Sequence, residues 1–117
     1  MRSSDKKVNS FLSSQINKIF FQLIVDIKAL KDAEVFAKDF FSEIELENFT
    51  KRLAIAYWLK KGRSYENIKD NLKVSSATIA SVAETTKKEG MVLALKKLEA
   101  EEWASKWSEK IKKIVGK

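Results

Sequence analysis

The segment Ser64–Val82 reads SYENIKDNLKVSSATIASV and has the apolar spacing of a helix-turn-helix motif. Two short helices that cross at a steep angle must bury apolar side chains against each other. The segment supplies such side chains at Ile68, Leu72, Val74, Ile79 and Val82. Hydroxyl residues suited to helix N-caps stand at Ser64 and at Ser75–Ser76. The pattern predicts a motif over about residues 64–89, with its turn at Lys73–Val74 and Gly90 as the stop of its second helix.

Helical spacing extends to the N-terminal side of the motif. Val8–Leu30 has apolar residues at helical intervals, and Phe21 and Val25 widen the apolar stripe beyond one face. Such a stripe fits a core helix of one chain or a helix wrapped between two subunits. We favour the second, because one small chain offers too little partner surface for both faces. After a break at Lys31–Asp32, a short helix is expected over Ala33–Phe41.

A capping box and a glycine delimit a long middle helix. Ser42 and Glu45 form an S-x-x-E pattern, in which each side chain bonds the backbone N–H of the other residue. This helix is expected to run to about Lys61 and to stop at Gly62. It is expected to bury Ile44, Phe49, Leu53, Ala56, Tyr57 and Leu59. A last helix is expected from Met91 to about Val115, with Trp103 and Trp107 as core or dimer-contact aromatics.

The composition of the 117 residues describes a helical and basic protein. Proline is absent and glycine occurs three times, so we expect one all-α domain over residues 1–117. The absence of cysteine and histidine excludes disulfides, thiolate or imidazole metal sites and imidazole acid–base chemistry; we expect no enzyme and no cofactor. The net charge of +7 favours a polyanionic partner. Neither a secretory signal nor a membrane span is predicted, which indicates a cytoplasmic protein without a membrane partner.

The positive charge is concentrated around the motif, which predicts double-stranded DNA as the partner. Between Lys60 and Lys97, nine Lys or Arg stand against four Asp or Glu. We expect the cations nearest the DNA phosphates to be Arg63, Lys69 and Lys73. We expect the second motif helix to meet the bases through the small residues Ser75, Ser76, Ala77, Thr78, Ala80 and Ser81. Capping of the helix is the alternative role for these serines, and for Ser75 we favour it.

Two runs of this sequence resemble the Trp repressor family: FFSEIELENFTKRLAIAYWLKKGRSYENI (Phe40–Ile68) and VSSATIASV (Val74–Val82). Within them, G-x-S-Y-x-x-I at Gly62–Ile68 and S-x-A-T-I at Ser75–Ile79 are similar to its TrpR-related (YerC/YecD-like) branch of helix-turn-helix regulators. The resemblance implies a six-helix fold and an intertwined homodimer that acts as a transcriptional regulator or repressor. It also implies that the second motif helices of the two subunits enter successive major grooves.

The chain departs from the family pattern at two positions. Lys73 stands where the turn usually has glycine, and a left-handed conformation there costs roughly 1 kcal/mol. Members that sense tryptophan hold it with two arginines, and Arg52 matches the first, so the resemblance assigns Arg52 to effector binding. Ser81 occupies the second position, where a hydroxyl offers no charge to a carboxylate. The sequence therefore predicts a regulator that does not respond to tryptophan, with another effector or none equally open.

Three other functions are open from the sequence alone. The two motif helices fit a docking surface for another protein, since a fold does not fix its function. A small helical enzyme could use Glu43, Glu45 and Glu47, although helix capping and the helix dipole explain these residues. The amphipathic end WASKWSEKIKKIVGK (Trp103–Lys117) fits a membrane-surface role.

Overall fold

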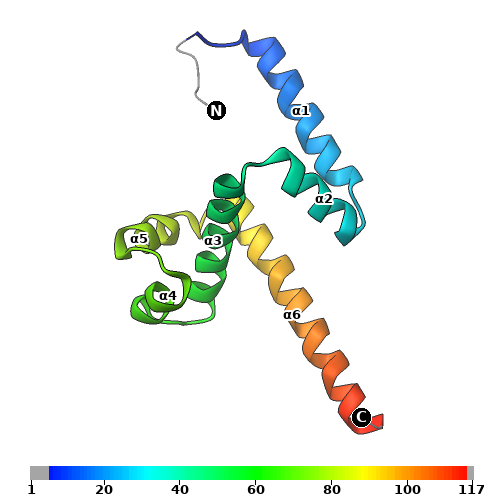
Figure 1. Cartoon of the computed structure of the whole chain (residues 1–117), viewed down its shortest axis with the longest axis vertical. Coiled ribbons are helices and arrows are strands. Elements are labelled where there is room, and N and C mark those ends of the chain that lie inside the picture. The colour runs from blue at the N-terminus through cyan, green and yellow to red at the C-terminus, as the bar shows by residue number, and fades with distance from the viewer. Residues whose placement is uncertain (1–5, 116–117) are drawn as a thin grey trace. The chain divides into compact units, whose positions relative to one another are not determined.

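Helices make up most of the described residues, as the sequence predicted (Figure 1). The structure is a computed structural model that describes the backbone of residues 6–115 and the side chains of residues 6–102. Within residues 6–115 there are six helices and no strand. They are α1 (Ser10–Asp26), α2 (Leu30–Phe40), α3 (Glu43–Lys60), α4 (Tyr65–Leu72), α5 (Ser76–Thr85) and α6 (Glu89–Val115). The predicted all-α fold class is confirmed. The side chains of Trp103 and Trp107, expected in a core or dimer contact, lie outside the described residues.

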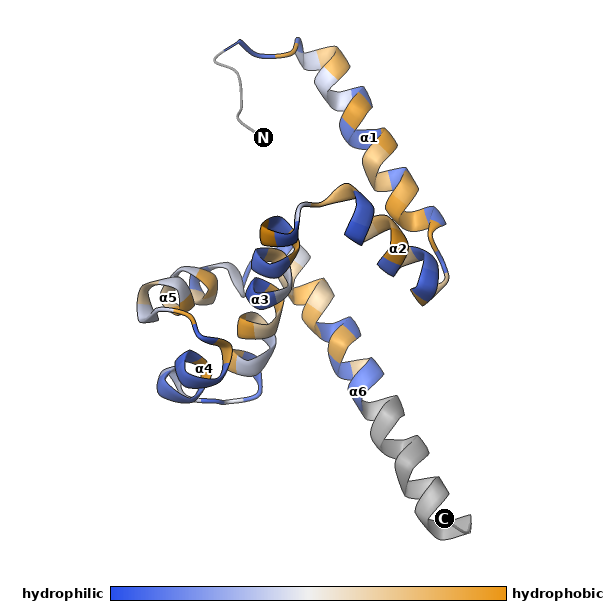
Figure 2. Cartoon of the chain, viewed as in Figure 1, coloured by the Kyte–Doolittle hydropathy of each residue, from blue (hydrophilic) through white to orange (hydrophobic). Residues whose placement is uncertain are grey.

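The first of two compact units ends at Leu46 and contains α1 and α2. Its aromatic rings associate: the centroid of Phe40 lies 5.0 Å from that of Phe36 and 5.9 Å from that of Phe20. Neither helix has a buried residue, and Phe11 and Ile19 on α1 are 72% and 68% exposed. Figure 2 shows how much of the surface of α1 is apolar. The described residues of this unit therefore form no buried apolar core.

The break between α1 and α2 lies nearer the N-terminus than we expected. The expected helices were Val8–Leu30 and Ala33–Phe41, whereas α1 ends at Asp26 and α2 begins at Leu30. Ile27 and Ala29 have extended backbones, and the Lys28 Nζ donates to the Val25 carbonyl at 2.8 Å. The lysine thus satisfies one of the carbonyls that the end of α1 leaves without a helical partner.

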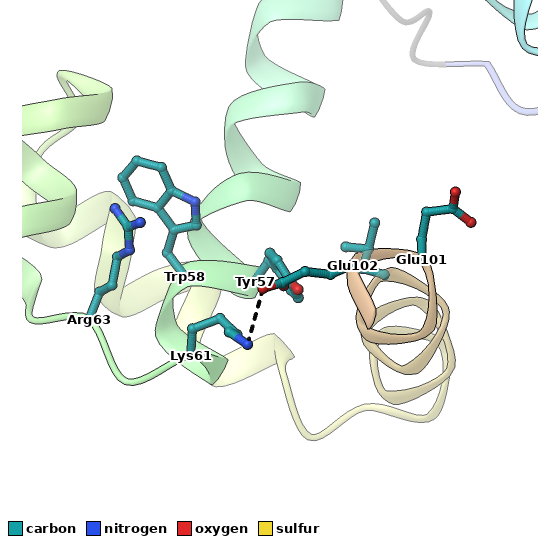
Figure 3. Close-up of a pocket in the computed structure, with 7 residues that line it drawn as sticks. Tyr57, Trp58, Lys61, Arg63, Glu101 and Glu102 are labelled. Carbon is teal, nitrogen blue, oxygen red and sulfur yellow. Dashed lines mark ion pairs between the residues drawn. The ribbon is translucent and has the colours of Figure 1, made fainter. Parts of the chain in front are cut away.

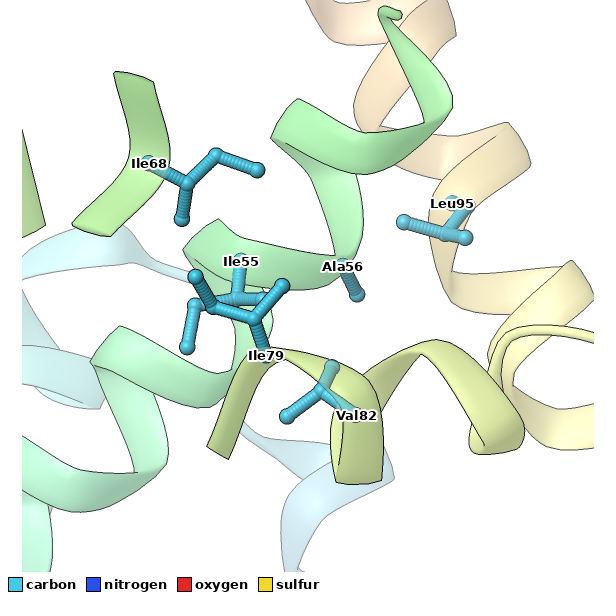
Figure 4. Close-up of a cluster of buried hydrophobic side chains, with 6 residues drawn as sticks. All are labelled: Ile55, Ala56, Ile68, Ile79, Val82 and Leu95. Carbon is cyan, nitrogen blue, oxygen red and sulfur yellow. The ribbon is translucent and has the colours of Figure 1, made fainter. Parts of the chain in front are cut away.

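The second unit, from Glu47 onward, contains most of α3 together with α4, α5 and α6. Figure 4 shows its core, in which side chains from all four helices meet. The buried members are Ile55, Ala56, Ile68, Ile79, Val82 and Leu95. Two ion pairs also join α3 to α6, from Lys60 to Glu99 at 3.5 Å and from Lys61 to Glu102 at 3.4 Å. The helix-turn-helix thus rests on α3 within one packed unit.

Both ends of α3 are fixed by the residues that the sequence singled out. The Ser42 N–H donates to Glu45 Oε1 at 2.9 Å, and the Glu45 N–H donates to Ser42 Oγ at 3.1 Å, which is the predicted capping box. Gly62, with φ 87°, has the left-handed conformation that ends a helix. The expected burial was wrong for Ile44, Phe49 and Leu53, which are 70%, 40% and 39% exposed. The residues of α3 that are buried, because they pack in the core of the second unit, are Ile55 and Ala56.

The junction of α5 and α6 also differs from expectation. The second motif helix was expected to reach Glu89 and stop at Gly90, but α5 ends at Thr85 and Gly90 lies inside α6. The hydroxyls of Thr85 and Thr86 donate to the carbonyls of Val82 and Ala83 at 2.7 and 2.8 Å. These local bonds occupy carbonyls at the end of α5, so that no glycine is needed there.

Candidate nucleic-acid interface

Serine caps set the beginnings of both motif helices. Ser64 Oγ accepts a hydrogen bond from the Asn67 N–H at 3.1 Å, which starts α4. Ser75 Oγ accepts from the Thr78 N–H at 3.1 Å, which starts α5, and lies 2.9 Å from Thr78 Oγ1. The capping role considered for Ser75 is therefore confirmed.

The turn between α4 and α5 has a lysine in a conformation that favours glycine. Lys73 has φ 56° and ψ 52°, the left-handed region, and its N–H donates to the Lys69 carbonyl at 3.0 Å. The Lys73 side chain is exposed. The expected strain is thus present, and it amounts to roughly 1 kcal/mol relative to glycine. In return, the sharpest bend of the motif presents a cation to solvent.

Burial beneath the motif fixes the angle between its helices. Ile68 of α4 and Ile79 of α5 are both fully buried, as is Ile55 of α3. Leu72 and Val74 are partly buried against the same cluster. The five apolar positions of the motif therefore pack as predicted, while the importance of Ile55 was missed. Its signal was the apolar helical interval of three residues to Trp58 and four to Leu59, both of which pack against the same cluster.

The outward side of α5 has small side chains over its first two turns, and the exposed Glu84 follows near its end. The residues that we expected to face DNA are all exposed: Ser75, Ser76, Ala77, Thr78, Ala80 and Ser81. None is larger than threonine, so that a groove wall could approach the α5 backbone closely. Thr78 is engaged with Ser75, whereas its methyl group is suited to apolar contact with thymine.

Four lysines near the motif differ in whether they form ion pairs. Lys60 and Lys61 pair with carboxylates of α6, so their charges are partly neutralised. Lys69 and Lys73 are exposed, and neither pairs with a carboxylate among the described residues. This second pair of lysines therefore remains available to an anionic partner.

Arg63 is held against a tryptophan, which the sequence did not reveal. Its guanidinium carbon lies 4.0 Å from the centroid of the Trp58 ring (Figure 3). Its Nη1 donates to Asn67 Oδ1 at 3.4 Å. The backbone causes this contact, because the Arg63 N–H donates to the Trp58 carbonyl and the Gly62 N–H to the Leu59 carbonyl. This bond pattern at a helix end brings the two side chains together.

Arg63 also borders a cavity of about 750 Å³ between α3 and α6. Tyr57 of α3 and Lys61, directly after α3, line one side, and Glu101 and Glu102 line it from α6 (Figure 3). The Tyr57 hydroxyl is buried without a hydrogen-bond partner among the described residues. Cations and carboxylates balance here, so the cavity has no strong preference for one sign of charge.

Arg52, the expected effector ligand, borders a different cavity of about 400 Å³. Its guanidinium carbon lies 5.6 Å from the centroid of the Phe49 ring. From α5, Thr78 and Val82 line this cavity, while Ser81 is not among its lining residues. The structure therefore does not bring Ser81 to the same cavity as Arg52.

The comparisons with known proteins agree with this geometry. A sequence model of a family described as Trp repressor protein matches residues 15–100, which is most of the chain. No curated protein and no solved structure matches the chain. Within the described residues, no helix is long and apolar enough to cross a membrane. With the packed helix-turn-helix and its six-helix order, the chain belongs to the Trp repressor family, a family of helix-turn-helix DNA-binding regulators and not of enzymes.

Proposed function

We propose that this protein is a dimeric, sequence-specific DNA-binding regulator of transcription, acting in the cytoplasm as a repressor. The observation that carries the proposal is the outward side of α5, where five small exposed residues and the N-cap Ser75 follow the cations Lys69 and Lys73, which form no ion pair among the described residues. Small side chains allow close approach to a groove, and the cations neutralise phosphates.

The base contacts in this proposal come from α5. Ser76 and Ser81 offer hydroxyls, and Ala77 and Ala80 offer methyl groups to thymine. None of the six proposed base-contacting residues can make a bidentate contact to a base, so water bridges and DNA shape would supply much of the specificity. Arg63, Lys69 and Lys73 would bind phosphates of the DNA backbone that flank the bases contacted by α5.

The dimer is proposed from the apolar surface that one chain leaves uncovered. Neither α1 nor α2 has a buried residue, and Phe49 and Leu53 on α3 are also exposed. Exposed apolar side chains in such number, on α1 and α2 and separately on α3, favour an interface. Because α1 is apolar on more than one side, an intertwined partner that covers both sides fits better than one that abuts a single face.

We propose that tryptophan does not control this regulator. Ser81 offers no positive charge, and the cavity that borders Arg52 is lined from α5 by Thr78 and Val82. A zwitterionic amino acid would meet only one of the two arginines that tryptophan-sensing members use. Titration of the protein with L-tryptophan should leave its DNA affinity unchanged.

Binding to duplex DNA tests the proposal, with Ala80→Glu as the decisive variant. The wild-type protein should shift random duplex DNA at low salt, and selection from a random pool should enrich one sequence. Ala80→Glu should abolish both results, because it places a carboxylate against the groove. Ala100→Glu adds the same charge at an exposed position of α6 and should bind as the wild type does.

Two results would contradict the proposal. Absence of any shift by the wild-type protein would favour the alternative of a protein–protein module. Retained binding by Ala80→Glu, with the dimer intact by sedimentation, would show that α5 does not face the groove.

A further inference from the structure

The cavity of about 400 Å³ lies where α3 meets the turn of the motif, and it has an apolar floor below a basic rim. Ile55 and Val82 form the floor and are 0% and 5% exposed. The rim includes Lys51 and Arg52 of α3 and Lys73 of the turn. Residues from separate elements thus bring three cations to one depression.

All of the charged side chains that line this cavity are positive. No carboxylate is among its lining residues, whereas the cavity between α3 and α6 has Glu101 and Glu102 opposite Lys61 and Arg63. Of the three rim cations, only Lys51 forms an ion pair among the described residues, with the exposed Glu47 at 3.4 Å. Arg52 and Lys73 have no such partner there, so the depression carries an uncompensated positive charge that favours an anion.

Hydrogen-bond donors reach the same depression. The hydroxyls of Ser75 and Thr78 line it and lie 2.9 Å apart, so one of them can donate outward when the other accepts. Two or more cations with hydroxyl donors form a site suited to the several oxygens of one phosphate. The mouth of the site lies at the start of α5, the helix that we propose to enter the groove.

We propose that this cavity seats one phosphate of the DNA backbone, held by Lys51 and Arg52 of α3 together with Lys73. The inference rests on the proposed function and extends the interface beyond the motif to α3. It also gives Arg52 a role in DNA binding in place of the effector role that the family resemblance implied. A free oxyanion such as inorganic phosphate presents the same charged oxygens to the cavity. The experiment distinguishes a phosphate of DNA from such a free anion.

The test compares two double variants that each remove two positive charges. Lys51→Gln/Arg52→Gln empties the α3 side of the cavity, and Lys96→Gln/Lys97→Gln changes two exposed lysines of α6 that do not line it. Affinity for one duplex is measured over a range of salt concentrations by fluorescence anisotropy. Circular dichroism and sedimentation check that both variants keep the wild-type fold and assembly.

The cavity variant should bind more weakly and with less salt dependence. Each neutralised phosphate contributes about 0.9 to the slope of log affinity against log salt, so two cavities in a dimer contribute about 1.8. If the affinity at 1 M salt is unchanged, this difference is about a 60-fold loss at 0.1 M salt. The α6 variant should keep the wild-type slope and lose less than about threefold.

The possible failures are distinct. If the wild-type protein binds no duplex, the proposed function fails and the cavity inference falls with it. If it binds and the cavity variant keeps its slope and affinity, only the cavity inference is wrong. A free-anion site would show instead as thermal stabilisation by inorganic phosphate at matched ionic strength, lost in the cavity variant while DNA affinity is kept; that result would overturn the inference.

Discussion

Lys73 combines a backbone that suits glycine with a charge that glycine lacks. At φ 56° its conformation is strained, and its side chain borders the basic cavity. Strained residues of this kind cluster at functional sites, because selection for a side chain there outweighs a small loss of stability. The structure therefore places stability and DNA affinity in conflict at one residue.

Lys73→Gly should raise the free energy of unfolding by about 1 kcal/mol, because it relieves the left-handed strain. It should also weaken DNA binding, because it removes a rim cation. Lys73→Gln is the matched control, since it removes the charge but keeps the strain: DNA binding should weaken to a similar extent without a gain in stability. Urea denaturation and anisotropy measure the two effects, and an unchanged stability for Lys73→Gly would contradict the strained turn.

Predictions for single residues succeeded where the interaction joins residues that are close in the sequence. The caps at Ser42, Ser64 and Ser75 involve residues three apart, so the sequence contains both partners. Predictions of burial failed more often, since the buried Ile55 was missed and the exposed Leu53 was expected to be buried. Which side of α3 is covered depends on α4, α5 and α6, and their placement is not local information. The stacking of Arg63 on Trp58 was missed for a similar reason, since it follows from how the end of α3 closes.

At the scale of elements, α3 spans the boundary between the two compact units. It begins with a capping box whose strength depends on the ionisation of the Glu45 carboxylate. The Ser42 backbone N–H, and then the Ser42 hydroxyl, donate to the Glu45 carboxylate and lower the pKa of Glu45. A group with a lowered pKa in the folded state stabilises the fold above its unfolded pKa. That stabilisation is lost as pH falls through the folded pKa.

Glu45→Gln should make the start of α3 insensitive to acid. Glutamine can still accept the Ser42 N–H bond but does not ionise, so the wild type should have the higher Tm at neutral pH. The difference in Tm between the two proteins should shrink as pH is lowered below about 4. Glu43→Gln lies in the same helical turn without the Ser42 bond, so its Tm difference from the wild type should vary less with pH. A Glu45→Gln difference that stays constant with pH would contradict this account.

The sequence predicted the number, order and type of the helices but not all of their ends. Gly62 ends α3 as expected, because a left-handed residue is needed there. Gly90 does not end α5, since the hydroxyls of Thr85 and Thr86 already occupy its last carbonyls. Of the proposed interface, the exposure of α5 was predictable from its small residues. The basic cavity was not, because it forms only when α3 packs against the motif turn.

At the scale of the whole molecule, the two units differ in how they are stabilised. The unit that contains the motif has a buried core drawn from four helices, whereas α1 and α2 bury none of their side chains. Under the proposed dimer, the second chain supplies the missing cover. The stability of α1 and α2 is then linked to protein concentration, while the core of the motif is formed by one chain.

Ile19→Lys should shift the protein from dimer to monomer, because it places a charge at a highly exposed apolar position of α1. Sedimentation velocity measures the shift, and helix content by circular dichroism should fall on dilution as α1 and α2 lose their cover. Lys18→Gln, one residue away at an exposed polar position, should leave the dimer unchanged. A wild-type protein that sediments as a monomer at micromolar concentration would contradict the dimer.

The absence of a core in α1 and α2 has a consequence for biosynthesis. These helices leave the ribosome before α3 to α6, and their exposed apolar side chains include those of Phe11 and Ile19. The motif unit, made later, can fold as soon as α6 has emerged. In the proposed dimer, α1 and α2 therefore become fully packed only after two chains have associated. Neighbouring ribosomes on one messenger RNA hold nascent copies close together and would therefore speed this association.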